Sequence, residues 1–156
     1  MAKVPAHLLR RRPHFFRPVP VRLRKGGWTV ERQCAFLAEL YFSGSVSAAA
    51  ESVGLTRASA YKLRARADAS SFARAWDSVL AKPGTGRLPP AKLNWQKLTL
   101  SAFINRVEAG LVQPVLYRGE MTAIRRKADD SGLLKLFRRT KQRRKRALLE
   151  EAKWDG

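Results

Sequence analysis

The chain has 156 residues, which suits one domain with extensions, and its hydrophobic fraction of 45% excludes wholesale disorder. It carries 32 Lys and Arg against 12 Asp and Glu, and this net charge of +20 predicts a polyanionic partner. No apolar stretch approaches the ~20 residues of a membrane span, and the single Cys34 excludes an internal disulfide. We therefore expect a soluble, cytoplasmic protein without a membrane partner.

Residues 1–27 are rich in arginine and proline and contain no acidic residue. Their four prolines prevent a continuous helix, because each lacks an N–H and restricts the residue before it. We expect this segment to be an extended, flexible arm outside the folded body.

Residues 28–81 have a more balanced charge and show helical periodicity. Thr29 is a good N-cap, Gly54 a natural helix end, and Thr56 a second N-cap. Cys34 lies on the apolar face of the first helix. The predicted helices are 30–42, 46–53, 57–67 and a fourth that begins after Ser70 or Ser71.

The composition of residues 82–90 is that of a linker. A fifth helix fits 91–109, and a small β-hairpin fits residues 114–124, with Arg118-Gly119 as its turn. A last helix is expected to begin near Leu133, after a cap at Asp129, Asp130 or Ser131, with Leu134 and Phe137 as its apolar anchors. Residues 91–137 form a helix–hairpin–helix region that we expect to support assembly, and 138–156 a basic C-terminal tail.

Residues 45–64, SVSAAAESVGLTRASAYKLR, have the spacing of a helix-turn-helix. Ala49 and Ala50 allow two short helices to cross closely, and Gly54 supplies the positive φ of the turn. Ala60 and Leu63 point inward at i, i+3, which leaves a polar and basic outer face on the following helix. Such a face suits entry into a DNA major groove.

Three stretches resemble helix-turn-helix proteins related to phage terminase small subunits: GWTVERQCAFLAEL, the segment from Ser43 to Arg64, and SFARAWDSVL. The later VLYRGEMTAIRRKADDSGLLKLF is similar to the hairpin and last helix of that group. The resemblance implies a homeodomain-like three-helix unit, a recognition helix at 57–66 and a C-terminal part that often mediates assembly. The arm before Gly27 and the strongly basic last helix depart from the group and suggest additional nucleic-acid contacts.

The sequence therefore predicts a mostly α fold: a homeodomain-like helix-turn-helix bundle, supporting helices, and a small C-terminal β-hairpin and helix. Residues expected to bind DNA are Ser45, Ser47, Thr56, Arg57, Ser59, Tyr61, Lys62, Arg64 and Arg66. The arm is expected to follow the DNA backbone or enter the minor groove through Arg10, Arg11, Arg12, Arg17, Arg22, Arg24 and Lys25.

The expected function is recognition of a double-stranded DNA site, as a nucleoid-associated transcriptional regulator. A DNA-recognition subunit of a phage packaging machine and an RNA- or ribosome-associated basic protein stay open as alternatives. Possible protein partners are a second copy of the chain, a large terminase subunit and the transcription machinery. We expect no enzymatic activity, cofactor or metal site, since the two histidines lie in the arm and no Cys/His spacing suits zinc.

Overall fold

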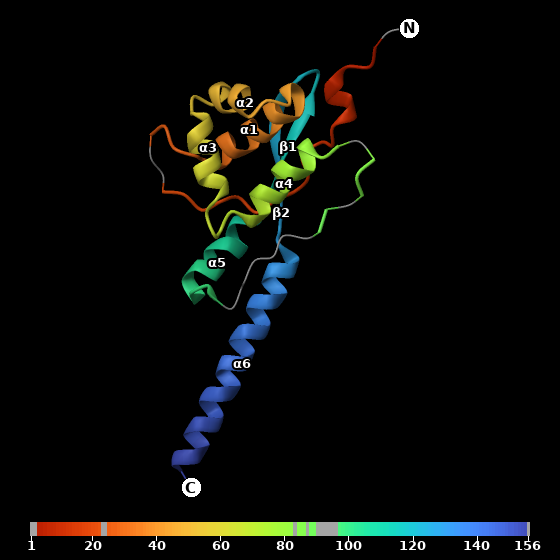
Figure 1. The fold of residues 1–156 in the computed structure, drawn as a ribbon. Helices are drawn as coiled ribbons and strands as arrows, with labels where there is room; N and C mark the ends of the chain where they lie inside the picture. The colour runs from red at the N-terminus through yellow and green to blue at the C-terminus, as the bar shows by residue number, and fades with distance from the viewer. Residues whose placement is uncertain (1–2, 23–24, 83, 87, 90–96, 156) are drawn as a thin grey trace.

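The computed structural model describes residues 3–22, 25–82, 84–86, 88–89 and 97–155. These residues form a mostly helical chain with one small antiparallel sheet, which confirms the expected class at that level (Figure 1). The helices are α1 (Val30–Ser43), α2 (Val46–Ser52), α3 (Arg57–Arg64), α4 (Ser70–Leu80), α5 (Leu100–Ala109) and α6 (Asp130–Trp154). A 3-10 helix, η1 (Ala6–Leu9), precedes them, and strands β1 (Leu111–Tyr117) and β2 (Glu120–Lys127) separate α5 from α6.

Side-chain caps fix where the first three helices begin. The hydroxyls of Thr29, Ser45 and Thr56 each accept a hydrogen bond from the backbone N–H three residues later. Gly44 and Gly54 follow α1 and α2 with φ angles of 69° and 75°, a region that glycine enters without a Cβ penalty. The predicted starts of α1, α2 and α3 are therefore confirmed, although α3 is three residues shorter than expected.

An aromatic cluster forms the centre of the core. Phe36 on α1 packs against Phe72 and Trp76 of α4, with ring centroids 6.0 and 4.9 Å apart. Cys34 is fully buried in the same core, as expected from its place on α1, and burial raises the pKa of its thiol to about 12. This thiol therefore serves as a small apolar side chain.

The expectation of a separate N-terminal arm is corrected by the packing of residues 13–19. Phe16 and Val19 belong to the core, at 0% and 1% exposure. The backbones of Phe16 and Val112 exchange two hydrogen bonds of 3.0 Å, so this segment pairs with β1. Burial of apolar side chains outweighs the local effect of the prolines, and the folded body extends beyond the predicted limits of 28 and 81.

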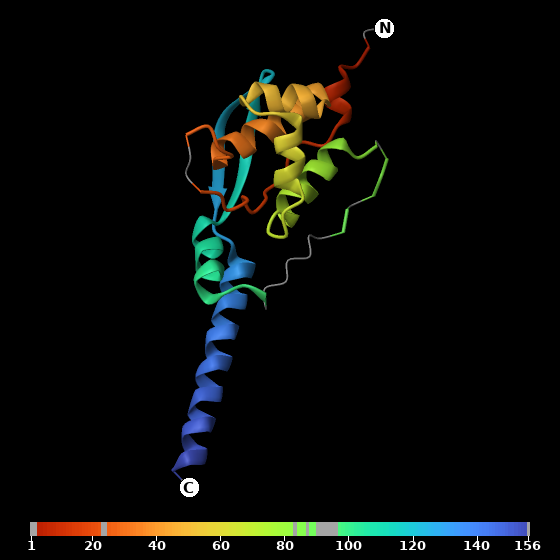
Figure 2. The same cartoon turned by 60° about the vertical axis from the view of Figure 1, so that its left-hand side comes forward.

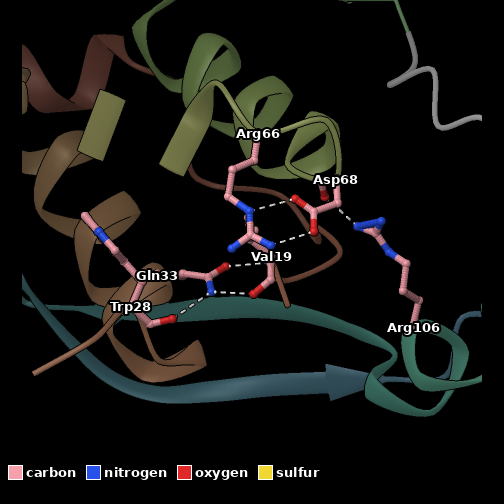
Figure 3. A network of polar contacts seen from close by, with 6 residues as sticks. All are labelled: Val19, Trp28, Gln33, Arg66, Asp68 and Arg106. Atoms are coloured by element: carbon pink, nitrogen blue, oxygen red, sulfur yellow. Dashed lines mark hydrogen bonds and ion pairs between the residues drawn. The ribbon is translucent and has the colours of Figure 1, made fainter. Parts of the chain in front are cut away.

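Gln33 joins this segment to α1 from inside the core (Figure 3). Its side-chain oxygen accepts from the Val19 N–H at 2.8 Å, and its amide nitrogen donates to the carbonyls of Val19 and Trp28 at 3.0 and 3.1 Å. A fully buried amide is stable there because its bonds replace those it made to water.

The hairpin is confirmed and is longer than predicted. Its strands pair from Leu111↔Lys127 to Tyr117↔Glu120, with a bulge after Val115. Two helix starts differ from the prediction. The cap of α4 is Ala69, without a side-chain bond, and α5 begins after Thr99. Residues 91–96 of the predicted fifth helix lie outside the described residues.

Helix α6 includes most of the residues expected to form a separate basic tail, which agrees with the expectation of a strongly basic last helix. Asp129 caps it by accepting from the Gly132 N–H at 3.0 Å, and the helix continues without a break to Trp154. It leaves the body beside α5 and projects away from it in both views (Figures 1 and 2). Leu134 and Phe137, the predicted anchors, are 51% and 65% exposed. Among the described residues, no helix has the length and apolar character to cross a bilayer.

Candidate nucleic-acid interface

Helix α3 buries two of its eight residues against the body. Ala60 and Leu63 are buried at 0% and 5% exposure and face α2 and α4. A helical turn takes 3.6 residues, so the opposite side presents Ala58, Tyr61 and Lys62, all of which are exposed. We call this surface the α3 face and define it as Arg57, Ala58, Tyr61, Lys62 and Arg66.

The α3 face begins in an ordered stack of aromatic and guanidinium groups. The Tyr61 ring packs against Trp76, with centroids 5.2 Å apart, and the Arg57 guanidinium lies 5.3 Å from the centre of the Tyr61 ring. Such cation–π contacts reduce the freedom of an exposed arginine. The stack therefore holds a positive charge over the first turn of α3.

Two residues that were predicted to contact DNA contact other side chains of the protein instead. The Ser59 hydroxyl accepts a 2.9 Å hydrogen bond from the Trp28 indole N–H. Arg64 forms a 2.7 Å ion pair with Asp77, and its guanidinium lies 5.0 Å from the Trp76 ring centre. Both side chains lie at the margins of the α3 face and help to fix it on the body.

Arg66 follows the end of α3 and belongs to a small charged network (Figure 3). Its guanidinium pairs with the Asp68 carboxylate at 2.7 Å, and the Asp68 carbonyl accepts a 2.6 Å hydrogen bond from Arg106 of α5. Arg66 remains exposed, so a phosphate can compete for it, since surface ion pairs are weak. Arg106 is 5% exposed, and its Nε and Nη1 find no acceptor among the described residues.

A groove of about 730 Å³ runs beside α3. Arg22, Lys62 and Arg66 bring cations to its walls, while Trp28 and Leu63 are among its apolar lining residues. Segment 20–22 and α3 thus contribute charge to one concave surface, although they lie far apart in the sequence. An anionic chain that passes along α3 would meet cations from both sides of the groove.

The other residues of the short helices that were predicted to bind DNA have different roles in the structure. Ser45 and Thr56 are N-caps, so their oxygens already accept backbone N–H groups. Ser47 is exposed in the first turn of α2.

The arm residues lie in three different settings. Arg10 donates to the carbonyls of Tyr41 and Phe42 at the end of α1, at 2.9 and 3.2 Å. Arg11 donates to the carbonyls of Thr85 and Gly86. Arg17 pairs with the buried Asp129 at 2.6 Å. Exposed side chains are Arg12, Arg22 and Lys25, whereas Arg24 lies outside the described residues.

Three arginines of the arm therefore hold the fold together, and of the arm cations that the structure describes, only Arg22 lines the groove beside α3. The prediction for the arm missed these internal contacts. The sequence alone does not distinguish an arginine that binds backbone carbonyls of its own protein from one that is free to bind a phosphate.

The sequence prediction also missed Ala58, which lies on the α3 face between larger side chains. The spacing of Ala58, Tyr61 and Lys62 follows the i, i+3, i+4 rule, and it could have placed Ala58 on the same side of the helix. A small side chain there lets the helix backbone come close to a ligand surface. No protein-family model, curated protein or solved structure matches this chain.

Proposed function

We propose that this protein binds double-stranded DNA through the α3 face and recognises a DNA site as a transcriptional regulator, without enzymatic activity or a cofactor. The observation that carries the proposal is a short helix whose buried residues are Ala60 and Leu63 and which presents Arg57 and Lys62 outward, with the exposed Arg66 just beyond its end. In this proposal α2, the turn at Gly54 and α3 act as a helix-turn-helix.

The dimensions and chemistry of the α3 face support a major-groove contact. A helix with its side chains is about 10–12 Å wide, close to the ~12 Å width of the groove. The exposed Ala58 permits close approach, and its methyl group suits contact with a thymine methyl. Arg57 and Lys62 are able to donate hydrogen bonds to guanine N7 and O6.

The groove beside α3 supports a phosphate contact next to the base contacts. Arg22 and Arg66 line it together with Lys62, and phosphate contacts set the position of a protein on the duplex. The net charge of +20 adds an attraction that does not depend on base sequence.

A packaging recogniser is the second candidate, with the same DNA interface. The order of a hairpin followed by a long helix after the bundle is the order that the resemblance to terminase small subunits implies. The two roles differ in their protein partner, so capture of a large terminase subunit would favour the second.

The experiment is selection of bound sequences from random duplex DNA, followed by affinity measurements with Arg57→Gln/Lys62→Gln. We expect the variant to lose ~1–3 kcal/mol of preference for the selected site for each residue that touches a base. The matched control, Lys82→Gln/Arg125→Gln, removes the same charge from exposed positions elsewhere and should keep that preference.

Unchanged site preference in the α3 variant, or equal affinity for duplex RNA of the same sequence, would contradict the proposal. Equal losses on selected and random DNA would confine the two residues to phosphate contacts and remove their role in recognition.

A further inference from the structure

The outer part of α6 is a helix without a core to cover. Every residue from Thr140 to Asp155 is exposed. The helix contacts the body through α5 near its beginning, and both views show the rest projecting into open space (Figures 1 and 2). Most helices are stabilised by packing of an apolar face, so this length of helix calls for a partner outside the described residues.

The charge on α6 identifies the kind of partner. Seven of the nine residues from 138 to 146 are Lys or Arg, and this basic block contains no carboxylate. Arg139 lies over the Phe103 ring of α5, 5.7 Å from its centre. Successive residues are turned by about 100°, so the other six cations surround the helix rather than share one side. Like charges three and four residues apart repel each other along a helix. A polyanion relieves that repulsion and gains from every contact.

A second copy of α6 fits this surface poorly. Leu134, Phe137 and Leu148 follow the 3–4 spacing of a coiled-coil seam, but Lys141 and Arg144 occupy the two positions between them. Pairing two such helices in an antiparallel manner would place one basic block against the other. A membrane surface fits poorly as well, because an interfacial helix needs its cations and its apolar residues on opposite sides.

We propose that the basic block, residues 138–146, is a second DNA-contacting element that enters the major groove of a duplex stretch outside the one contacted by α3. This inference rests on the proposed function, which supplies duplex DNA as the ligand. A continuous helix in the major groove lies between the two phosphate strands, so cations on opposite sides of the block reach both. The contact adds affinity without reading bases.

The test compares the salt dependence of affinity for a long random-sequence duplex. The variant is Arg143→Gln/Arg144→Gln/Arg146→Gln, in which glutamine keeps a good helix propensity, and circular dichroism verifies the helix. The control Lys3→Gln/Lys82→Gln/Arg125→Gln removes the same charge at exposed positions elsewhere.

We expect the slope of log affinity against log salt to fall by about 2–3 in the α6 variant, since each phosphate contact contributes about 0.9. The length of DNA protected from nuclease should also shorten, whereas the control should keep both values. A wild-type slope or protected length in the α6 variant would overturn the proposal.

Two further measurements separate this inference from its alternatives. If the α6 variant loses self-association in sedimentation but keeps its DNA affinity, the block is a contact between copies and the proposal fails. If it loses more affinity for duplex RNA than for duplex DNA, the assignment to DNA fails. An α3 variant that binds normally would overturn the proposed function alone, because the salt slope of the α6 variant does not depend on α3.

Discussion

Helices α1 and α6 have the same backbone hydrogen bonds but opposite surroundings. Seven of the 14 residues of α1 are buried, whereas Gly132 is the one buried residue of the 25 in α6. In α1 the buried residues spread around much of the helix, which packs against α2, α4 and both strands. In α6 the cations surround the helix, and no face is suited to a core. Helix formation alone therefore does not tell which helices build the body and which ones extend from it.

The largest expected difference between the two helices concerns large apolar side chains. Phe36 of α1 is fully buried and packs on Phe72 and Trp76, so Phe36→Ala should lower the free energy of unfolding by about 3–5 kcal/mol. Leu148 of α6 is 58% exposed, and Leu148→Ala should change the free energy of unfolding by less than about 0.5 kcal/mol. Urea unfolding followed by tryptophan fluorescence measures both. Comparable losses would show that α6 is packed in solution.

The junction between the body and α6 offers a second comparison, between two arginines. Burial alone would raise the pKa of Asp129, but hydrogen bonds from Arg17 and the Gly132 N–H outweigh it and lower that pKa. Arg17→Met leaves this carboxylate buried without its cation and should cost about 3 kcal/mol.

Arg106→Met is the matched variant. Burial lowers the pKa of Arg106, and part of its guanidinium has no acceptor among the described residues, so loss of this charge should leave the free energy of unfolding unchanged or raise it. Thermal unfolding of the two variants tests the pair. A larger loss for Arg106→Met than for Arg17→Met would contradict this account of the junction.

The smallest expected effect is a pH dependence of the free energy of unfolding, and it arises from a histidine in the body. Burial lowers the pKa of His14 from 6.5, and the positive charge of Arg74 acts in the same direction. The unfolded chain then binds the proton more tightly, so the contribution to stability is full above pH 6.5 and is lost as the pH falls toward the folded pKa. Its slope is at most about 1.4 kcal/mol per pH unit.

Urea unfolding between pH 7.5 and about pH 5 should show a flatter dependence for His14→Gln than for the unchanged chain. The same slope in both proteins would mean that His14 is not desolvated in the folded state.

Local signals explain how much of the fold could be predicted. The caps Thr29, Ser45 and Thr56 and the glycine at position 54 act within a few residues, and the helices they delimit were predicted closely. The pairing of Phe16 with Val112 joins positions almost one hundred residues apart, and no local sequence pattern predicts it. The prolines around Phe16 were therefore interpreted as a sign of flexibility.

The candidate site was predictable to the same extent. The inward spacing of Ala60 and Leu63 indicated which side of α3 is exposed, and burial agrees. The engagement of Ser59 by Trp28 and of Arg64 by Asp77 depends on how separate segments come together, so those two residues were included among the expected DNA contacts.

The pairing of Phe16 with Val112 also bears on how the chain reaches its native state during synthesis. While a ribosome is still translating the middle of the message, the nascent chain already contains the first helices but lacks the strand on which Phe16 comes to rest. Pairing across such a separation is slow compared with helix formation. The body therefore completes its folding only after the hairpin has left the exit tunnel, and until then the apolar side chains that pack on Val112 lack that cover.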